Sequence, residues 1–200
     1  MITPEIILHL SQDNYMKQVL ESVEMFQWGT GNDVYSDLLE SIVSQQLSVK
    51  AAATIHGRFI ALFEDGFPHP EQLLALDVPT LRSVGLSNQK ASYMRNVAEF
   101  FVQENLQAID WSGFTDEEII KKLTAIKGVG RWTVEMILMF TLNRPDVLPV
   151  DDLGIQNAMK RLYGLEETGK ILRARMVELA EPWRPYRTYA CRYLWKWKDS

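Results

Sequence analysis

The chain has 200 residues, of which 46% are hydrophobic and 24% are charged, as in an ordinary globular protein. Its formal net charge of −5 counts against nucleic-acid binding as a first interpretation, because nucleic-acid-binding proteins usually carry a basic surface. No apolar run reaches the length of about 18 residues that a membrane span needs, so the sequence predicts no transmembrane helix.

Cysteine and histidine usage excludes several kinds of site. The single cysteine, Cys191, rules out an internal disulfide framework and a four-cysteine iron–sulfur cluster. The three histidines are scattered, and no pair has the spacing of zinc ligands, so we expect no catalytic metal and no cofactor. The chain starts without a basic segment or a small-residue cleavage site. Together with the single cysteine, this start favours a cytoplasmic protein.

Helical periodicity runs through nearly the whole chain. Apolar residues recur at three-to-four spacing from Tyr35 to Phe63, which predicts one long helix there. The same spacing predicts a helix that starts near Lys90 and another from Trp132 to Leu142. The last of these stretches is apolar on all sides, which is typical of a helix buried at the centre of a bundle.

Glycine and proline clusters separate these helical stretches. The breaks fall at residues 66–70, 85–87, 145–149 and 182–185, and Asp77 starts a short helix between the first two. No alternating strand pattern is present, so we predict an all-α fold of about nine or ten helices. We expect one lobe at about 33–110 and a second lobe from 1–32 plus 111–200.

The most specific local signal lies between Leu123 and Val134, where two glycines one residue apart interrupt a helical pattern. Such a turn lets the amides of Gly128, Val129 and Gly130 face outward at the start of the next helix, where they suit a phosphate group. Lys127 and Arg131 flank the turn and add positive charge. On the two glycines alone, an ordinary αα-hairpin with a glycine turn is the favoured explanation.

The wider string Ile-Lys-Gly-Val-Gly-Arg-Trp-Thr resembles the helix-hairpin-helix of the base-excision DNA glycosylases, the HhH-GPD superfamily. The resemblance implies two helical lobes with a cleft between them, the hairpin at 123–134 in the lobe that holds the chain ends, and a catalytic aspartate on a loop about twenty residues further on. Asp151 and Asp152 stand there. A carboxylate at this place stabilises the positive charge that develops on deoxyribose when the glycosidic bond breaks, and it orients the attacking water.

An aspartate before an apolar helix is also an ordinary N-cap, and that explanation suffices for one of the two. The family's spacing to a basic residue on the next helix is met by Asp152 and Arg161. We therefore expect Asp152 to be the catalytic residue and keep Asp151 as the alternative.

Bifunctional members of the superfamily carry a lysine directly after Gly-Val-Gly-Arg, and this chain has Trp132 there. The resemblance thus implies hydrolysis by water, without the Schiff base that leads to strand cleavage. The strings Gly-Arg-Trp-Thr and Asp-Asp-Leu, with Ser-Gln-Gln-Leu-Ser near the start, are similar to the 3-methyladenine DNA glycosylase II family, over residues 33–197. This chain resembles a short form without the extra N-terminal β-domain.

Further roles follow from the same resemblance. Gln46 or its neighbour Leu47 fills the gap that the flipped base leaves, although Leu47 also suits a core position. Trp132 and Trp195 line the base pocket, and Met136 stands where the family has a pocket tyrosine. Electron-rich indole rings attract an alkylated, cationic base.

The expected function is therefore base excision repair by a monomeric glycosylase that acts on alkylated purines in double-stranded DNA, with no membrane contact. Three alternatives remain at this point: a glycosylase for oxidised or deaminated bases, a helix-hairpin-helix module that binds DNA without catalysis, and an all-α protein–protein interaction domain, which would explain the acidic charge. Clustered basic residues around the hairpin and in the C-terminal segment predict modest, salt-sensitive DNA binding on an otherwise acidic protein.

Overall fold

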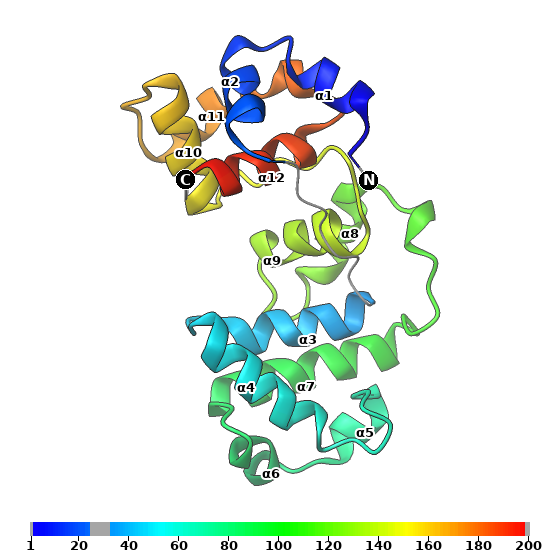
Figure 1. The fold of residues 1–200 in the computed structure, drawn as a ribbon. Helices are drawn as coiled ribbons and strands as arrows, with labels where there is room; N and C mark the ends of the chain where they lie inside the picture. Colours follow the sequence, from blue (N-terminus) through cyan, green and yellow to red (C-terminus); the bar gives the residue numbers. More distant parts are fainter. Residues whose placement is uncertain (1, 25–32, 199–200) are drawn as a thin grey trace. The chain divides into compact units, whose positions relative to one another are not determined.

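The structure is a computed structural model that describes residues 2–24 and 33–198. Within these ranges every regular element is a helix, which confirms the predicted all-α class (Figure 1). The chain divides into two compact units. We call Met1–Thr30 with Leu138–Ser200 the terminal unit, and Gly31–Ile137 the central unit. None of the described helices is both long and apolar enough to span a membrane.

The central unit is a bundle around α7. Its helices are α3 (Val34–Ser44), α4 (Val49–Ile60), α5 (Pro70–Ala75), α6 (Val78–Ser83), α7 (Asn88–Gln103), α8 (Asp116–Leu123) and α9 (Arg131–Met136). Helix α7 packs against α3, α5 and α6, while α8 packs against α9. The apolar stripe predicted from periodicity forms the core, where Leu38, Ile42, Phe59 and Phe101 are buried.

The terminal unit joins the two ends of the chain. It contains α1 (Pro4–Leu10), α2 (Asn14–Ser22), α10 (Leu153–Tyr163), α11 (Gly169–Leu179) and α12 (Arg187–Lys198), with α12 packed on α10 and α2. Asp13 caps α2 and ties the ends together, because its other carboxylate oxygen accepts hydrogen bonds from the Tyr163 hydroxyl at 2.5 Å and the Trp183 indole at 2.9 Å.

The prediction of one long helix from Tyr35 to Phe63 is wrong. The helix is interrupted at residues 45–48, so that two helices, α3 and α4, form instead. Gln46 has a φ of +58°, in the left-handed region that interrupts a right-handed helix. Ser48 then caps α4 by accepting a hydrogen bond from the amide of Ala51 at 3.3 Å. Because predicted helices are interrupted in this way, the described residues contain twelve α-helices, more than the nine or ten expected.

Several of the predicted boundaries are confirmed. Asp77 caps α6, and Ser87, at the end of the predicted break 85–87, caps α7. Helix α8 begins with a capping box formed by Thr115 and Glu118. After α9 the helical stretch continues as a single π-helical turn, Ile137–Thr141, and two short 3-10 turns lie at Trp111–Gly113 and Glu181–Trp183. The compact units divide at 30 and 137, whereas the expected lobes divided at 32 and 110, so the hairpin lies in the central unit.

Candidate functional site

The glycine turn joins α8 to α9 and has the tight form expected from its sequence. Gly128 has a φ of +108°, and a Cβ atom built on it would lie 2.3 Å from Cγ of Tyr93. Gly130 caps α9 in an extended conformation, and a Cβ atom there would meet nothing within 4 Å. The Lys127 carbonyl accepts a hydrogen bond from the Asn96 side chain at 3.0 Å, so α7 holds the turn in place. The close contact with Tyr93 thus explains why residue 128 is a glycine, whereas no contact among the described residues requires a glycine at residue 130.

Charged side chains around the turn contact one another. The Arg131 guanidinium donates to Glu117 on α8 at 2.8 Å and to the buried Glu135 on α9 at 3.0 Å. These two carboxylates raise the pKa of Arg131 above its ordinary value, Glu117 most strongly. Lys127 is exposed. The two basic residues predicted to contact phosphate therefore have different surroundings. Lys127 faces solvent, whereas Arg131 connects the two helices of the hairpin through its carboxylate partners.

The break between α3 and α4 exposes the two residues predicted to fill the gap in DNA. Gln46 is exposed, and 38% of the Leu47 surface is accessible, so Leu47 is not the core residue that periodicity allowed. Trp132 is also exposed, at 43%, and Met136 is half-buried on the same helix. All four belong to the central unit.

Asp152 lies in the terminal unit at the start of α10, where it both caps the helix and contacts Trp195. Its Oδ1 accepts hydrogen bonds from the Ile155 amide at 2.8 Å and from the Trp195 indole N–H at 2.8 Å. The residue is buried, with 9% of its surface accessible. A Cβ atom on Gly154 would lie 3.0 Å from this oxygen and 3.1 Å from the Trp195 ring, so glycine permits their close approach. The N-cap of α10 is therefore the same residue that the sequence predicts to be catalytic.

An aromatic stack fixes the Trp195 ring. Trp195 stacks on Phe140 with ring centroids 5.7 Å apart and an angle of 28° between the planes. The Arg192 guanidinium lies 4.9 Å from the centre of the Phe140 ring and donates to the carbonyl of Met139. Burial lowers the pKa of Arg192. The indole that contacts Asp152 is therefore held by packing as well as by its hydrogen bond.

Asp151 has a different environment from its neighbour. It is exposed, and its carboxylate forms an ion pair with Arg173 on α11. The negative charge of Asp151 is therefore partly balanced at the surface of the terminal unit. The two aspartates, which the dipeptide alone leaves equivalent, are distinguished by burial and by partner.

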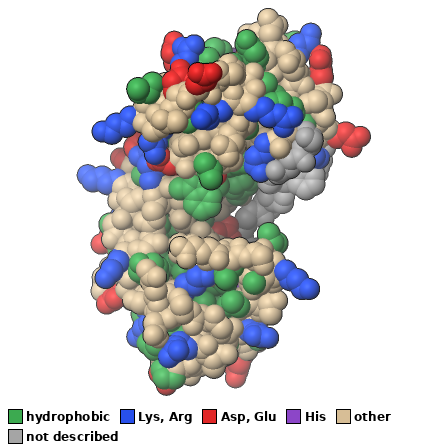
Figure 2. Space-filling view, turned by 90° about the vertical axis from the view of Figure 1, so that its left-hand side faces the viewer, with side chains coloured by type: hydrophobic (Ala, Val, Ile, Leu, Met, Phe, Trp, Pro, Cys, Tyr) green, Lys and Arg blue, Asp and Glu red, His purple; other side chains and the backbone are tan. Residues whose placement is uncertain are grey.

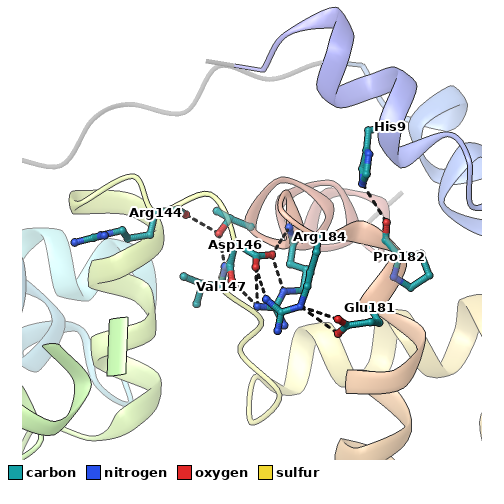
Figure 3. A network of polar contacts seen from close by, with 9 residues as sticks. His9, Arg144, Asp146, Val147, Glu181, Pro182 and Arg184 are labelled. Carbon is teal, nitrogen blue, oxygen red and sulfur yellow. Dashed lines mark hydrogen bonds and ion pairs between the residues drawn. The ribbon is translucent and has the colours of Figure 1, made fainter. Parts of the chain in front are cut away.

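A cluster of polar contacts fastens the loop before α10 to the start of α12 (Figure 3). The Asp146 carboxylate accepts hydrogen bonds from Arg184 at 2.6 Å and from Arg187 at 2.7 and 3.0 Å. The Thr188 hydroxyl accepts from the Val147 amide at 2.9 Å. Helix α12 therefore contacts the loop at its first turn through this cluster and at its far end through Trp195.

Several of the basic residues that cluster in sequence are buried or paired with carboxylates. Arg184 and Arg187 bind Asp146, Arg192 is buried, and Lys122 forms an ion pair with Glu104 at 3.1 Å. On the face shown in Figure 2, lysine and arginine side chains are spread over both units, with acidic side chains among them in several places. No group of His, Cys, Asp or Glu in the described ranges has the arrangement of a metal site.

Comparison with known proteins identifies the family. Residues 39–185 match the family described as HhH-GPD superfamily base excision DNA repair protein. The chain belongs to this superfamily. A relative from Bacillus subtilis, described as a putative DNA-3-methyladenine glycosylase, is 34% identical to this HhH-GPD protein over 194 residues, which cover 92% of this chain and 67% of the relative.

Two solved structures are also similar to this HhH-GPD protein. The DNA-3-methyladenine glycosidase of Bacillus halodurans is 39% identical, covers 97% of this chain with 88% of its own, and superposes with a TM-score of 0.83. The 3-methyladenine DNA glycosylase of Schizosaccharomyces pombe, solved in complex with abasic DNA, is 34% identical and covers 96% of this chain with 95% of its own, at a TM-score of 0.81. The resemblance to 3-methyladenine DNA glycosylases is thereby confirmed.

Sequence reasoning missed several residues that support these sites. Tyr93 and Asn96 on α7 brace the hairpin, and Lys90 on the same helix contacts the end of α3. Gly154 lets Trp195 approach Asp152. Only Gly154 had a local signal, a glycine in the first turn of a helix, where it carries a conformational cost.

Proposed function

We propose that this chain is a monofunctional DNA glycosylase that excises alkylated purines of the 3-methyladenine type from duplex DNA and leaves an abasic site. The relatives named above support the reaction class, and the abasic-DNA complex of the Schizosaccharomyces pombe enzyme supports the product. The observation that carries the assignment within this chain is the buried Asp152, which receives the Trp195 indole N–H.

In the proposed reaction the base is first rotated out of the helix, because its glycosidic bond is inaccessible in the stack. The bond between C1′ and the base nitrogen then breaks, and its electron pair leaves with the base. An alkylated purine that carries a positive charge departs as a neutral molecule, so no proton donor is needed. Water adds to C1′, and its proton passes to the Asp152 carboxylate and then to solvent.

Asp152 suits this task for electrostatic reasons. The sugar becomes positively charged in the transition state, and a fixed carboxylate stabilises that charge. Two N–H donors hold Oδ1, and the positive end of α10 lies at the same place, so the carboxylate is oriented before the substrate arrives. The exposed Asp151, paired with Arg173, has neither form of support.

Recognition of DNA is proposed to use the amides of Gly128 and Gly130 together with Lys127. The Val129 amide, also predicted to face outward, instead donates to the Ile126 carbonyl at 3.0 Å. Gln46 and Leu47 would fill the gap left by the flipped base, and Trp132, Trp195 and Met136 would contact the base itself. The monomeric state and the cytoplasmic location expected from the sequence stay predictions.

The test compares two variants on alkylated duplex DNA, with released bases measured by chromatography. Asparagine is also a good N-cap, so Asp152→Asn keeps the start of α10 intact while removing the charge. We expect Asp152→Asn to slow base release by about 100-fold or more, and Asp151→Asn to stay close to the wild type. The opposite pattern would transfer the assignment to Asp151.

Further outcomes separate the alternative functions. If the wild type binds the duplex but releases no base, the protein is a non-catalytic DNA-binding module. Release confined to duplexes with oxidised or deaminated bases would move the substrate class. Strand breaks without added alkali would contradict hydrolysis by water alone, since they require a covalent amine intermediate.

A further inference from the structure

The break between α3 and α4 has a defined conformation rather than a frayed one. Helix α3 ends at Ser44, and the amide of Leu47 donates to the Ser44 carbonyl at 3.2 Å instead of continuing the helical pattern to Val43. Gln46 takes the left-handed conformation, and Ser48 caps the next helix. The result is a four-residue segment, residues 45–48, that carries Gln46 and Leu47 exposed at its tip.

A lysine from another helix completes this break. The Nζ atom of Lys90, in the first turn of α7, donates a hydrogen bond of 2.7 Å to the carbonyl of Val43. That carbonyl would pair with the Leu47 amide if α3 continued, so Lys90 takes the place of the missing helical partner. Helices α3 and α7 lie side by side, and the contact spans 47 residues of sequence (Figure 1).

The placement of Lys90 is unfavourable by local rules. A cation in the first turn of a helix meets the positive end of the α7 dipole. The side chain is half-buried, and desolvation lowers the pKa of its ammonium group. The negative end of the α3 dipole offsets this cost, because the Val43 carbonyl at the end of α3 accepts a hydrogen bond from the Lys90 ammonium group. Departures from local preference of this kind are typical of functional positions, because an apolar side chain would pack there without the desolvation cost.

We propose that Lys90 is a positioning residue for base flipping: its bond to Val43 ends α3 at the point that presents Gln46 and Leu47 as a preformed insertion into DNA. This inference rests on the proposed glycosylase function. A segment already in its inserting conformation loses less conformational entropy on entering the duplex than one that must be ordered at that moment. Lys90 itself contacts neither the base nor the reacting atoms.

The first measurement needs no substrate. Lys90→Met keeps the length of the side chain but removes the donor and the charge, whereas Lys90→Arg keeps both. We expect faster hydrogen exchange of the Leu47 amide in Lys90→Met and exchange near the wild-type rate in Lys90→Arg. Lys170→Met is the matched control, because Lys170 is also in the first turn of a helix, α11, but is exposed. Unchanged exchange in Lys90→Met would overturn the proposal.

The second measurement compares one alkylated purine in two duplexes, fully paired in the first and unpaired in a bulge in the second. An unpaired base needs little help to leave the stack. Under single-turnover conditions we expect Lys90→Met to lose about 10- to 100-fold on the paired lesion, the equivalent of one hydrogen bond to a charged group, and much less on the bulge. Lys90→Arg should restore the rate.

Two results distinguish failure of this inference from failure of the proposed function. An equal loss on both duplexes would mean that Lys90→Met damages the whole enzyme, and it would overturn the positioning role. Absence of base release by the wild type would instead remove the glycosylase function, while the exchange measurement would still decide whether Lys90 orders the segment. Lys90→Met should also add no further loss on the paired lesion in a Leu47→Ala background, because both changes act on the same insertion.

Discussion

Replacing Gly128 by alanine places a methyl group where the hairpin has no room for one. The new carbon would lie 2.3 Å from Cγ and 2.7 Å from Cβ of Tyr93, near the root of that side chain, so a change of rotamer cannot relieve the overlap. The φ of +108° adds a backbone penalty for any residue with a Cβ atom.

The two effects together set the size of the expected change. A backbone penalty of about 1–3 kcal/mol and an overpacking penalty of similar size lower the free energy of unfolding by roughly 2–6 kcal/mol. For a chain of this length that corresponds to a drop in melting temperature of roughly 5–20 °C. Thermal unfolding followed by circular dichroism measures it. A melting temperature within about 2 °C of the wild type would refute this reasoning.

Gly130→Ala is the matched comparison, because the hairpin leaves space for its methyl group. Alanine is a weaker N-cap than glycine, but it restricts the unfolded chain, and the two effects offset each other to within about 1 kcal/mol. We expect a melting temperature near that of the wild type and weaker binding of duplex DNA, measured by fluorescence anisotropy at fixed salt. Tyr93→Ala should reduce the penalty of Gly128→Ala by the overpacking part alone.

The remaining predictions concern two aromatic side chains, the half-buried Trp195 and the buried Tyr35. Trp195→Phe keeps the stack on Phe140 but removes the N–H that holds Asp152, so base release should fall by roughly 10- to 100-fold while binding of abasic DNA changes little; an unchanged single-turnover rate would contradict this. Tyr35 is buried and its hydroxyl has no hydrogen-bond partner among the described residues, so Tyr35→Phe should be neutral or stabilising. Burial raises the pKa of Tyr35, so folding favours its neutral form, and stability present below about pH 10 is lost above it. Urea midpoints on either side of that pH should fall less in Tyr35→Phe than in the wild type.

Local signals in the sequence predicted the helices well and their interruptions less well. The start of α6 at Asp77 was visible because a cap is made by neighbours in sequence. The break at residues 45–48 was not, because the apolar periodicity continues through it and the partner that completes it, Lys90, lies on another helix. Ser48 as a potential cap was the one local sign.

The same distinction holds at the candidate site. Asp152 was favoured over Asp151 from a family spacing, whereas the structure separates the two by a contact with Trp195, 43 residues away. The charge around the hairpin was counted from sequence, but whether Arg131 meets a phosphate or a carboxylate depends on Glu117, one helix earlier. The sequence identified the residues of the site, but it could not predict the contacts that they make with distant segments.

The construction of the terminal unit from both ends of the chain has a consequence for biosynthesis. The central unit is continuous in sequence and can fold as soon as it leaves the ribosome. Asp13, in contrast, must wait for Tyr163 and Trp183, and Asp152 gains its indole partner only when α12 emerges. A nascent or prematurely terminated chain would therefore carry the glycine turn and the segment 45–48 while Asp152 still lacked its contact with Trp195.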